Sequence, residues 1–293
     1  MENTGNSNSI TRKYLDSLLI ETRYIDSTTP TTDFTLFGES FSTPIMTAAL
    51  SHLSHTVEGA GALLAEGAKN AGAAAWYGMA DESEIDSISA TGARLIEIIK
   101  PYDDRDLIYK KIAHAEKLGH LAVGIDIDHP FGPDGSPDIC DGFTLRALTS
   151  LELAQICAST KLPVIIKGVL SLSDADRALG AGAGGLVLSH HNNRIEFAIP
   201  PLAILPEIAD LVNGAVPIFV DCEIRTGMDA FKALALGASG VCIGRPLISA
   251  LQKDPESGVE EYLRKATDEL RKVMAFTGCT DLGKMDKTVI RRL

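Results

Sequence analysis

The sequence predicts an α/β barrel of eight βα units, with an N-terminal extension over residues 1–43 and a C-terminal helical segment. Short β-branched or apolar runs alternate with longer amphipathic segments, which is the pattern of parallel strands joined by crossover helices. Eight such units follow one another, and no linker-like segment interrupts the chain after about residue 10. We therefore expect one domain that spans residues 1–293.

Each strand is predicted where an apolar run of strand length is bounded by Gly, Pro or polar residues. The predicted strands are Pro44–Ala48, Ala73–Gly78, Arg94–Ile99, Leu121–Ile127, Pro163–Lys167, Gly185–Ser189, Pro217–Asp221 and Gly240–Gly244. The alternative architecture is a doubly wound open sheet, whose first βα turn should carry G-x-G-x-x-G. The turn after Ala48 reads ALSHLSHTVEG and lacks that motif, which favours the barrel.

Amphipathic segments between these runs predict the helices. They are Glu58–Ala71, Asp104–Leu118, Leu148–Ser159, Ser173–Leu179, Leu202–Val212 and Met228–Leu236, with a last helix after Pro246. Ser173 is a predicted N-cap because two aspartates follow it closely. Gly119, Gly180 and Gly237 are predicted where helix ends favour a left-handed residue.

Composition excludes several classes of protein. With 39 acidic and 27 basic residues the net charge is -12, which disfavours a nucleic-acid binder. No apolar run approaches the roughly 20 residues of a membrane span, and the polar start MENTGNSNSITRKY predicts a cytoplasmic protein. The five cysteines are odd in number and include no C-x-x-C pair, so neither a disulfide framework nor a metal site is expected.

In a barrel of this kind, the reactive groups lie at the carboxyl ends of the strands. The sixth predicted strand runs into SHHNNR, where His191 and Arg194 suit a base beside an anion-binding guanidinium. The fourth ends in DIDHP, so a carboxylate could lie across the mouth from the imidazole and favour its protonated form. Lys167 ends the apolar fifth strand and must point into the mouth or pair, because an isolated buried ammonium is costly.

Two arginines follow the last two strands. Arg225 lies in DCEIRTG and Arg245 follows Gly244 in GVCIGRP. The loops after the seventh and eighth strands of such barrels commonly bind phosphate, where backbone N–H groups and a forked guanidinium meet the dianion. The pair therefore predicts a phosphate site.

These motifs resemble those of the FMN-dependent α-hydroxy-acid oxidase and dehydrogenase family. The resemblance is strongest in LPVIIKGVLSLSDADRALGAGAGGLVLSHH and in LPEIADLVNGAVPIFVDCEIRTGMDAFKALALGASGVCIGRPLISAL, and weaker over nearly the whole chain. It implies FMN as cofactor and oxidation of a small 2-hydroxy acid, or a related hydroxy substrate, to the keto product.

The resemblance also implies roles for single residues. His191 matches the base, Arg194 the arginine for the substrate carboxylate, Lys167 the lysine near flavin N1, and Asp128 the partner of the histidine. Residues implied to bind the cofactor are Ala48, Ala49, Gly78, Glu97, Lys167, Ser189, Asp221, Arg225, Gly244 and Arg245.

Several positions depart from the family pattern. Q-x-Y at the end of the third strand becomes Glu97-Ile98-Ile99, which removes the tyrosine that contacts the substrate hydroxyl. Two glycines of the histidine signature become Asn192 and Asn193, the least costly substitutes at positive φ. The turn D-G-G becomes Asp221-Cys222-Glu223, so that an acid near a dianion should weaken phosphate binding unless it points away. The loop after the fourth strand is short and lacks the usual arginine.

Two alternatives stay open. A non-catalytic or degenerate flavin-binding barrel would explain the lost tyrosine and the altered turn. An FMN-dependent isomerase of the same superfamily would need a basic pocket for a diphosphate, and the sequence offers few spare arginines. By resemblance a homo-oligomer, commonly a tetramer, is expected, and the small-molecule partner should be anionic.

Overall fold

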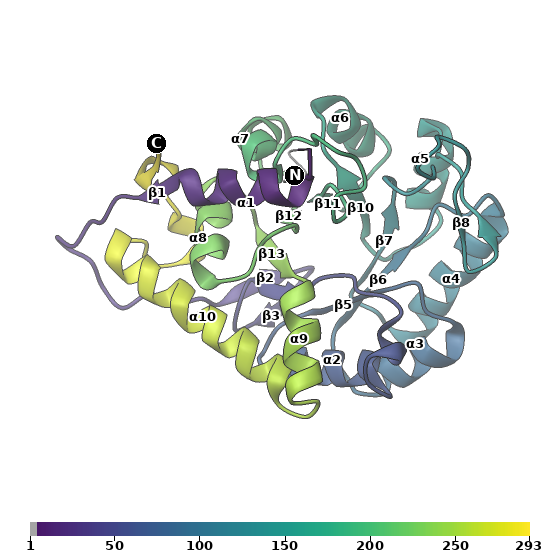
Figure 1. Ribbon diagram of the computed structural model, residues 1–293, viewed down its shortest axis with the longest axis horizontal. Helices are drawn as coiled ribbons and strands as arrows, with labels where there is room; N and C mark the ends of the chain where they lie inside the picture. Colours follow the sequence, from purple (N-terminus) through teal and green to yellow (C-terminus); the bar gives the residue numbers. More distant parts are fainter. Residues whose placement is uncertain (1–4) are drawn as a thin grey trace.

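Eight parallel strands form a barrel in the computed structural model, which describes residues 5–293 except the side chain of Ser54 (Figure 1). Residues 1–4 of the predicted N-terminal extension lie outside the described residues. The strands are paired in the order β4-β13-β12-β11-β10-β7-β6-β5. Their bounds are β4 Ile45–Thr47, β5 Ala75–Gly78, β6 Leu95–Ile99, β7 Ala122–Asp126, β10 Val164–Val169, β11 Gly185–Leu188, β12 Ile218–Val220 and β13 Gly240–Ile243. The predicted barrel and its eight strands are confirmed.

A side chain helps to close the barrel between β4 and β5, the two strands at the ends of this pairing order. Thr47 Oγ1 accepts a hydrogen bond from the Trp76 backbone N–H at 2.7 Å and donates to the Trp76 carbonyl at 3.2 Å. Leu50 then forms a parallel bridge with Tyr77. Thr47 is fully buried, and buried backbone groups need hydrogen-bond partners. Its hydroxyl therefore satisfies the Trp76 backbone groups that a neighbouring strand would otherwise pair with.

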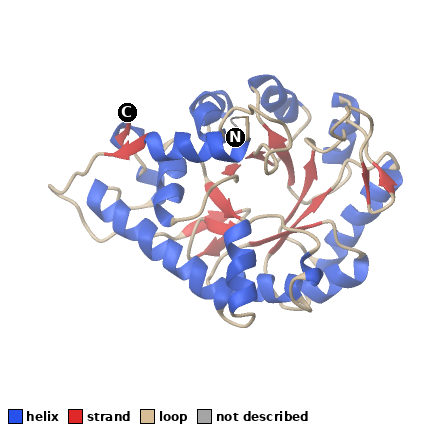
Figure 2. Cartoon of the chain, viewed as in Figure 1, coloured by secondary structure: helices blue, strands red, loops and turns tan. Residues whose placement is uncertain are grey.

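Helices cover the outside of the barrel (Figure 2). They are α2 Ala60–Asn70, α3 Glu82–Ser89, α4 Arg105–Leu118, α5 Ser150–Ala158, α6 Leu172–Gly180, α7 Pro201–Val212, α8 Gly227–Ala235, α9 Arg245–Lys253 and α10 Gly258–Thr277. The six predicted helices correspond to α2 and α4–α8. The segment after Pro246 divides into α9 and α10, and α3 was not delimited from the sequence.

Some predicted helix ends are wrong. The N-cap of α6 is Ser171, whose side chain accepts from the Asp174 N–H, and Ser173 lies inside the helix. Gly180 is the last residue of α6, and the left-handed residue comes two positions later at Gly182. Gly119 and Gly237 do have positive φ, as predicted.

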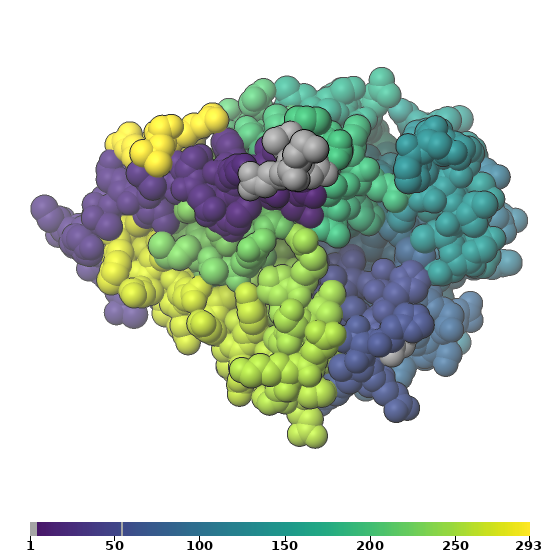
Figure 3. Space-filling model, in the orientation of Figure 1, coloured from purple at the N-terminus to yellow at the C-terminus, as the bar shows by residue number. Residues whose placement is uncertain are grey.

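The chain ends pack together beside the barrel. In the extension, α1 (Ser7–Ser17) leads into β1 (Leu18–Ile20), which pairs antiparallel with β14 (Ile290–Arg292). The N-terminal residues, in purple, and the C-terminal residues, in yellow, accordingly lie next to each other on the surface (Figure 3). The hairpin of β2 (Phe34–Leu36) and β3 (Glu39–Phe41) contributes Phe34 and Leu36 to the core inside the barrel.

Two apolar cores hold the molecule together. One fills the barrel and includes Trp76 and Phe219, whose rings meet edge to face at 5.1 Å. The other lies between the strands and the helices. Because side chains alternate along a strand, each barrel strand serves both cores. Within residues 5–293 no helix is long and apolar enough to span a bilayer.

Candidate active site

A cavity of about 570 Å³ opens at the carboxyl ends of the strands. Lys167 and His191 line one end of it, and Glu223 and Arg245 line the other. Ala48 and Ala49, which follow β4, line the wall between these ends, together with Asp221 and Gly244. Of the residues predicted to bind a cofactor, Gly78, Glu97 and Ser189 do not line the cavity.

A carboxylate that follows β7, two strands away from β11 in the barrel, holds His191 in place. Its Nδ1 lies 2.8 Å from Asp128 Oδ1, in the loop after β7. Gly168 in β10 makes room for this carboxylate, because a Cβ there would lie 2.3 Å from Asp128 Cγ. The turn that follows β11 places His191, Asn192 and Asn193 at positive φ, which fits the two asparagines. His191 Nε2 has no partner among residues 5–293, and the imidazole lines the cavity.

The other members of this loop have structural contacts. The Ser189 hydroxyl accepts a hydrogen bond from the His191 backbone N–H at 3.0 Å and does not line the cavity. His190 Nδ1 accepts from the Asn193 N–H, so its Nε2–H donates to Thr11 of α1 at 2.9 Å. His190 therefore ties α1 to the barrel, and His191 is the imidazole of the mouth.

Asp126, at the end of β7, lies beneath His191 between two ammonium groups. Lys100 Nζ donates to Asp126 Oδ2 at 2.5 Å, and Lys167 Nζ donates to Oδ1 at 3.1 Å. His191 Nδ1 is 3.4 Å from the same Oδ1. All three of Asp126, Lys100 and Lys167 are buried. Lys167 thus reaches the mouth, as predicted, and pairs there with Asp126, which was not among the predicted site residues.

Charge and burial set the protonation of this cluster. Burial raises the pKa of Asp126, but Lys167, His191 and Lys100 outweigh it and hold that pKa well below its usual range. Burial and the Asp126 charge raise the pKa of Asp128 to about 6. Burial and Lys167 lower the pKa of His191, whereas Asp126 and Asp128 raise it, and the net result is a pKa above the ordinary value. His191 therefore takes up a proton readily, as a general base must.

Arg194 is engaged by the loop after β7. Its Nη2 forms an ion pair with Asp138 and donates to the Phe131 carbonyl. His129 Nε2 lies 2.9 Å from the same Asp138 carboxylate, while His129 Nδ1 accepts from Lys100 at 2.7 Å. Burial and the Lys100 charge lower the pKa of His129 to about 4, so this ring is neutral. Arg194 thus lies against the loop after β7 and does not line the cavity, and an internal carboxylate already occupies it.

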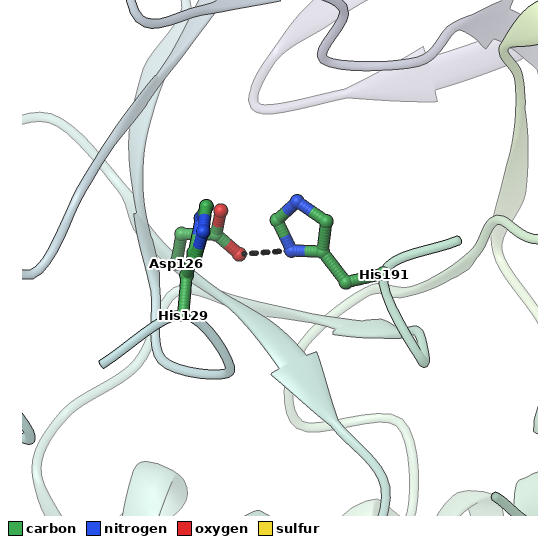
Figure 4. Close-up of side chains that lie close together, drawn as sticks. All are labelled: Asp126, His129 and His191. Carbon is green, nitrogen blue, oxygen red and sulfur yellow. Dashed lines mark ion pairs between the residues drawn. The ribbon is translucent and has the colours of Figure 1, made fainter. Parts of the chain in front are cut away.

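Asp126, His129 and His191 could together surround a metal ion, since their ligand atoms lie within 4.8 Å of one another. Figure 4 shows His129 next to Asp126 and the His191 ring on the other side of the dashed line that marks its ion pair with Asp126. However, Lys100 already donates to both Asp126 and His129, and Lys167 donates to Asp126. A cation would have to displace two ammonium groups, so we assign no metal to this cluster.

At the other end of the cavity, an acid bridges the two predicted phosphate arginines. Glu223 Oε2 pairs with Arg225 Nη2, and Glu223 Oε1 pairs with Arg245 Nη2. Its side chain is 1% exposed, whereas both guanidinium groups are 52% exposed. The arginines therefore converge as predicted, but Glu223 points toward them.

The end of β6 corrects two predictions. Ile98 points into the barrel core, so Glu97 and Ile99 point the opposite way, toward the helices. Glu97 lies beside His120 and does not line the cavity, and the prediction that it contacts a flavin is wrong. Lys100, on the same face as Ile98, is the residue that enters the mouth here. Gly78 lies at the barrel seam, where its N–H donates to the Leu50 carbonyl.

Glu97 predicts a measurable pH dependence of stability. Glu97 Oε2 and His120 Nδ1 are buried 3.5 Å apart, and neither has a hydrogen-bond partner among the described residues. Burial raises the pKa of Glu97 to about 7 and lowers that of His120 to about 4. Because the folded chain holds the Glu97 proton more tightly, the Glu97 contribution to stability should fall by about 3 kcal/mol as pH rises from about 4.5 to above 7. The lowered pKa of His120 contributes a rise in stability between about pH 4 and 6.5, so the Glu97 loss is measured as the difference between the parent and a Glu97 variant.

Glu97→Gln should remove this loss. Urea unfolding at pH 5 and pH 8 measures it, with Glu66→Gln on the exposed face of α2 as the control. If Glu97→Gln keeps the pH dependence of the parent, the buried carboxyl is not its source.

The sequence and the fold both have known relatives. A profile of the family described as FMN-dependent dehydrogenase matches residues 2–149 and 138–292. Glycolate oxidase 2 of Oryza sativa subsp. indica is 32% identical over 290 residues, which cover 86% of this chain and 78% of that protein. The chain belongs to the FMN-dependent dehydrogenase family. The resemblance noted in the sequence is thereby confirmed.

Further relatives of this family member are similar over different lengths. Glycolate oxidase of Spinacia oleracea is 30% identical over 93% of this chain and 82% of its own length. L-lactate oxidase of a Roseobacter species is 43% identical over 147 residues, or 50% of this chain and 40% of that protein. A crystal structure of mandelate oxidase with (S)-2-phenylpropionate superimposes with a TM-score of 0.89 at 29% identity, covering 99% of this chain and 90% of that one.

The cavity has the chemistry that the family's cofactor requires. Small residues, Ala48 and Ala49, leave space for a flat ring beside Lys167, whose ammonium can meet negative charge on it. Gly244 lines the same cavity, and even a Cβ there would only make an ordinary van der Waals contact with Ala48 at 3.4 Å. Arg225 and Arg245 are the cations for a phosphate. The residues present therefore fit FMN, whereas Glu223 competes with its phosphate for the two arginines.

Proposed function

We propose that this protein is an FMN-dependent oxidoreductase that oxidises a small 2-hydroxy acid, or a related hydroxy substrate, to the keto product. One observation carries the proposal: the His191 imidazole is fixed by Asp128 through Nδ1, and its Nε2 is free beside the cavity that Lys167 enters. Family membership supports the same activity. FMN, when bound, would accept the two electrons that the substrate loses.

The chain's own residues would bind and deprotonate the substrate. His191 Nε2 takes the proton of the substrate hydroxyl, and the resulting imidazolium is stabilised by Asp128 and Asp126. Arg194 is the cation for the substrate carboxylate. Since Asp138 already pairs with Arg194, a substrate carboxylate must share that guanidinium or displace Asp138. This pairing also favours the alternative function, a non-catalytic flavin-binding barrel.

Anaerobic reduction separates the two functions. Protein loaded with FMN is mixed without oxygen with glycolate, lactate or mandelate, and the visible absorbance of the flavin is followed. Rapid bleaching by at least one hydroxy acid is the expected result. Protein that takes up FMN but keeps its absorbance with every member of the panel would point to the non-catalytic barrel.

Location and assembly stay predictions. Cytoplasmic location rests on the polar start of the sequence, and homo-oligomerisation rests on the family resemblance. Sedimentation of the purified chain at several concentrations measures the assembly directly.

A further inference from the structure

The Glu223 carboxylate occupies the position between two guanidinium groups at the loops after β12 and β13. Each carboxylate oxygen pairs with a different arginine, Arg225 or Arg245. A forked guanidinium binds a carboxylate and a phosphate through the same N–H donors. The acid therefore occupies donors that a phosphate would otherwise use.

The backbone fixes Glu223 in this position. Cys222 and Glu223 both have φ of +64°, a conformation that costs energy for residues other than glycine. Arg12 of α1 donates through Nη1 to the Glu223 carbonyl at 3.1 Å and pairs with Asp229 at the start of α8. Helix α1 thus holds the turn from outside, and the carboxylate is directed inward.

The position between Arg225 and Arg245 can still attract an anion. One carboxylate and two guanidinium groups leave a formal charge of +1. Both arginines are half exposed, and within residues 5–293 their side chains use only Nη2 in the hydrogen bonds to Glu223. The cavity reaches this corner, because Glu223, Arg225 and Arg245 all line it. A phosphate ester could therefore arrive there, but only in competition with Glu223.

We propose that the Glu223 carboxylate competes with the phosphate of the cofactor for Arg225 and Arg245. FMN must displace this carboxylate from both arginines in order to bind. The inference rests on the proposed function. Under this proposal, Glu223 determines how much more tightly the protein binds FMN than riboflavin. Riboflavin has the same ring and ribityl chain but no phosphate, so its binding does not require the carboxylate to move.

Two variants of Glu223 test the proposal. Glu223→Gln removes the charge with little change of shape, and Glu223→Gly also relieves the positive φ, so at least one of them should fold. Both should bind FMN about tenfold or more tightly than the parent, the size of one charge-assisted interaction. Riboflavin affinity should change less than about threefold, since no phosphate contact is involved.

Flavin fluorescence titrations of the full chain give the dissociation constants of FMN and of riboflavin for the parent and for both variants. Glu207→Gln removes the same charge at an exposed position of α7 that does not line the cavity, and it serves as the control. Equal tightening of FMN and riboflavin, or weaker binding of FMN by both variants, would overturn the proposal while leaving the proposed function intact.

A second measurement does not depend on flavin. Inorganic phosphate should raise the melting temperature of Glu223→Gln and Glu223→Gly more than that of the parent, because the two arginines then lack their internal anion. If neither flavin binds to any of the proteins, the proposed function fails, and the phosphate shift alone decides this inference. Equal shifts in parent and variants would overturn it.

Discussion

Replacing His191 by alanine should slow reduction of the bound flavin by hydroxy acid about 10²- to 10⁴-fold, the usual contribution of a general base. Flavin binding should persist, because the cavity keeps Lys167, Ala48 and Ala49. The measurement is single-turnover bleaching of FMN-loaded protein under anaerobic conditions. His190→Gln is the matched control, since His190 bonds to Thr11 of α1 and not to the mouth.

The rate should also depend on pH in a defined direction. The neutral imidazole is the base, and the acids beside His191 raise its pKa above the ordinary value. The rate of flavin reduction should therefore rise with pH and level off above that raised pKa. Asp128→Asn removes one of the charges that raise it, so the midpoint should move to lower pH and the maximal rate should fall.

A different result would reassign the base. A His191→Ala protein that is reduced as fast as the parent would show that His191 does not take the proton. An unchanged midpoint in Asp128→Asn would show that the 2.8 Å contact with His191 has no role in its titration.

The barrel could be predicted because its signals are local. Each strand is a short apolar run, and each predicted range contains the observed strand, apart from β10, which continues to Val169. Helix ends were less predictable, because two serines near the start of α6 both suit an N-cap. The choice of Ser171 over Ser173 depends on where the backbone turns into the helix.

The site was predictable only in part. Strand ends identify the mouth of the barrel, and the cavity there is lined by His191, Lys167, Arg225 and Arg245. Asp128 contacts His191, and Arg194 pairs with Asp138 in the loop after β7. Glu97 was misplaced because an apolar run such as LIEII does not show which residues face the barrel interior. Lys100 was missed for the same reason, although it follows the strand directly.

Pairing between loops could not be predicted either. Arg194 and Asp138 are 56 positions apart and belong to different loops, so only the folded chain shows that they meet. Asp126 carried a visible signal, an acid at the end of an apolar strand two positions before Asp128. Its neighbours Lys100 and Lys167 come from two other strands, and the sequence does not show that both ammonium groups converge on it.

Loss of the Asp126 carboxylate should strongly destabilise the fold. Asp126→Asn leaves the ammonium groups of Lys100 and Lys167 buried without their shared carboxylate. Removing one partner of a buried ion pair typically costs about 3–5 kcal/mol. Urea unfolding at pH 7 measures the loss, and the parent should keep this contribution down to acid pH, because the pKa of Asp126 lies well below its usual range.

Lys100→Met provides the matched comparison. It removes one of the two cations, but Asp126 still pairs with Lys167 at 3.1 Å, so the loss should be smaller than for Asp126→Asn. The double variant should lose less stability than the sum of the two single variants. Part of the cost of Asp126→Asn is the unpaired Lys100 ammonium, and Lys100→Met removes that ammonium. Additive losses, or an Asp126→Asn protein as stable as the parent, would mean that these buried charges do not depend on one another. The cluster beneath His191 would then contribute to the protonation of the base without supporting the fold.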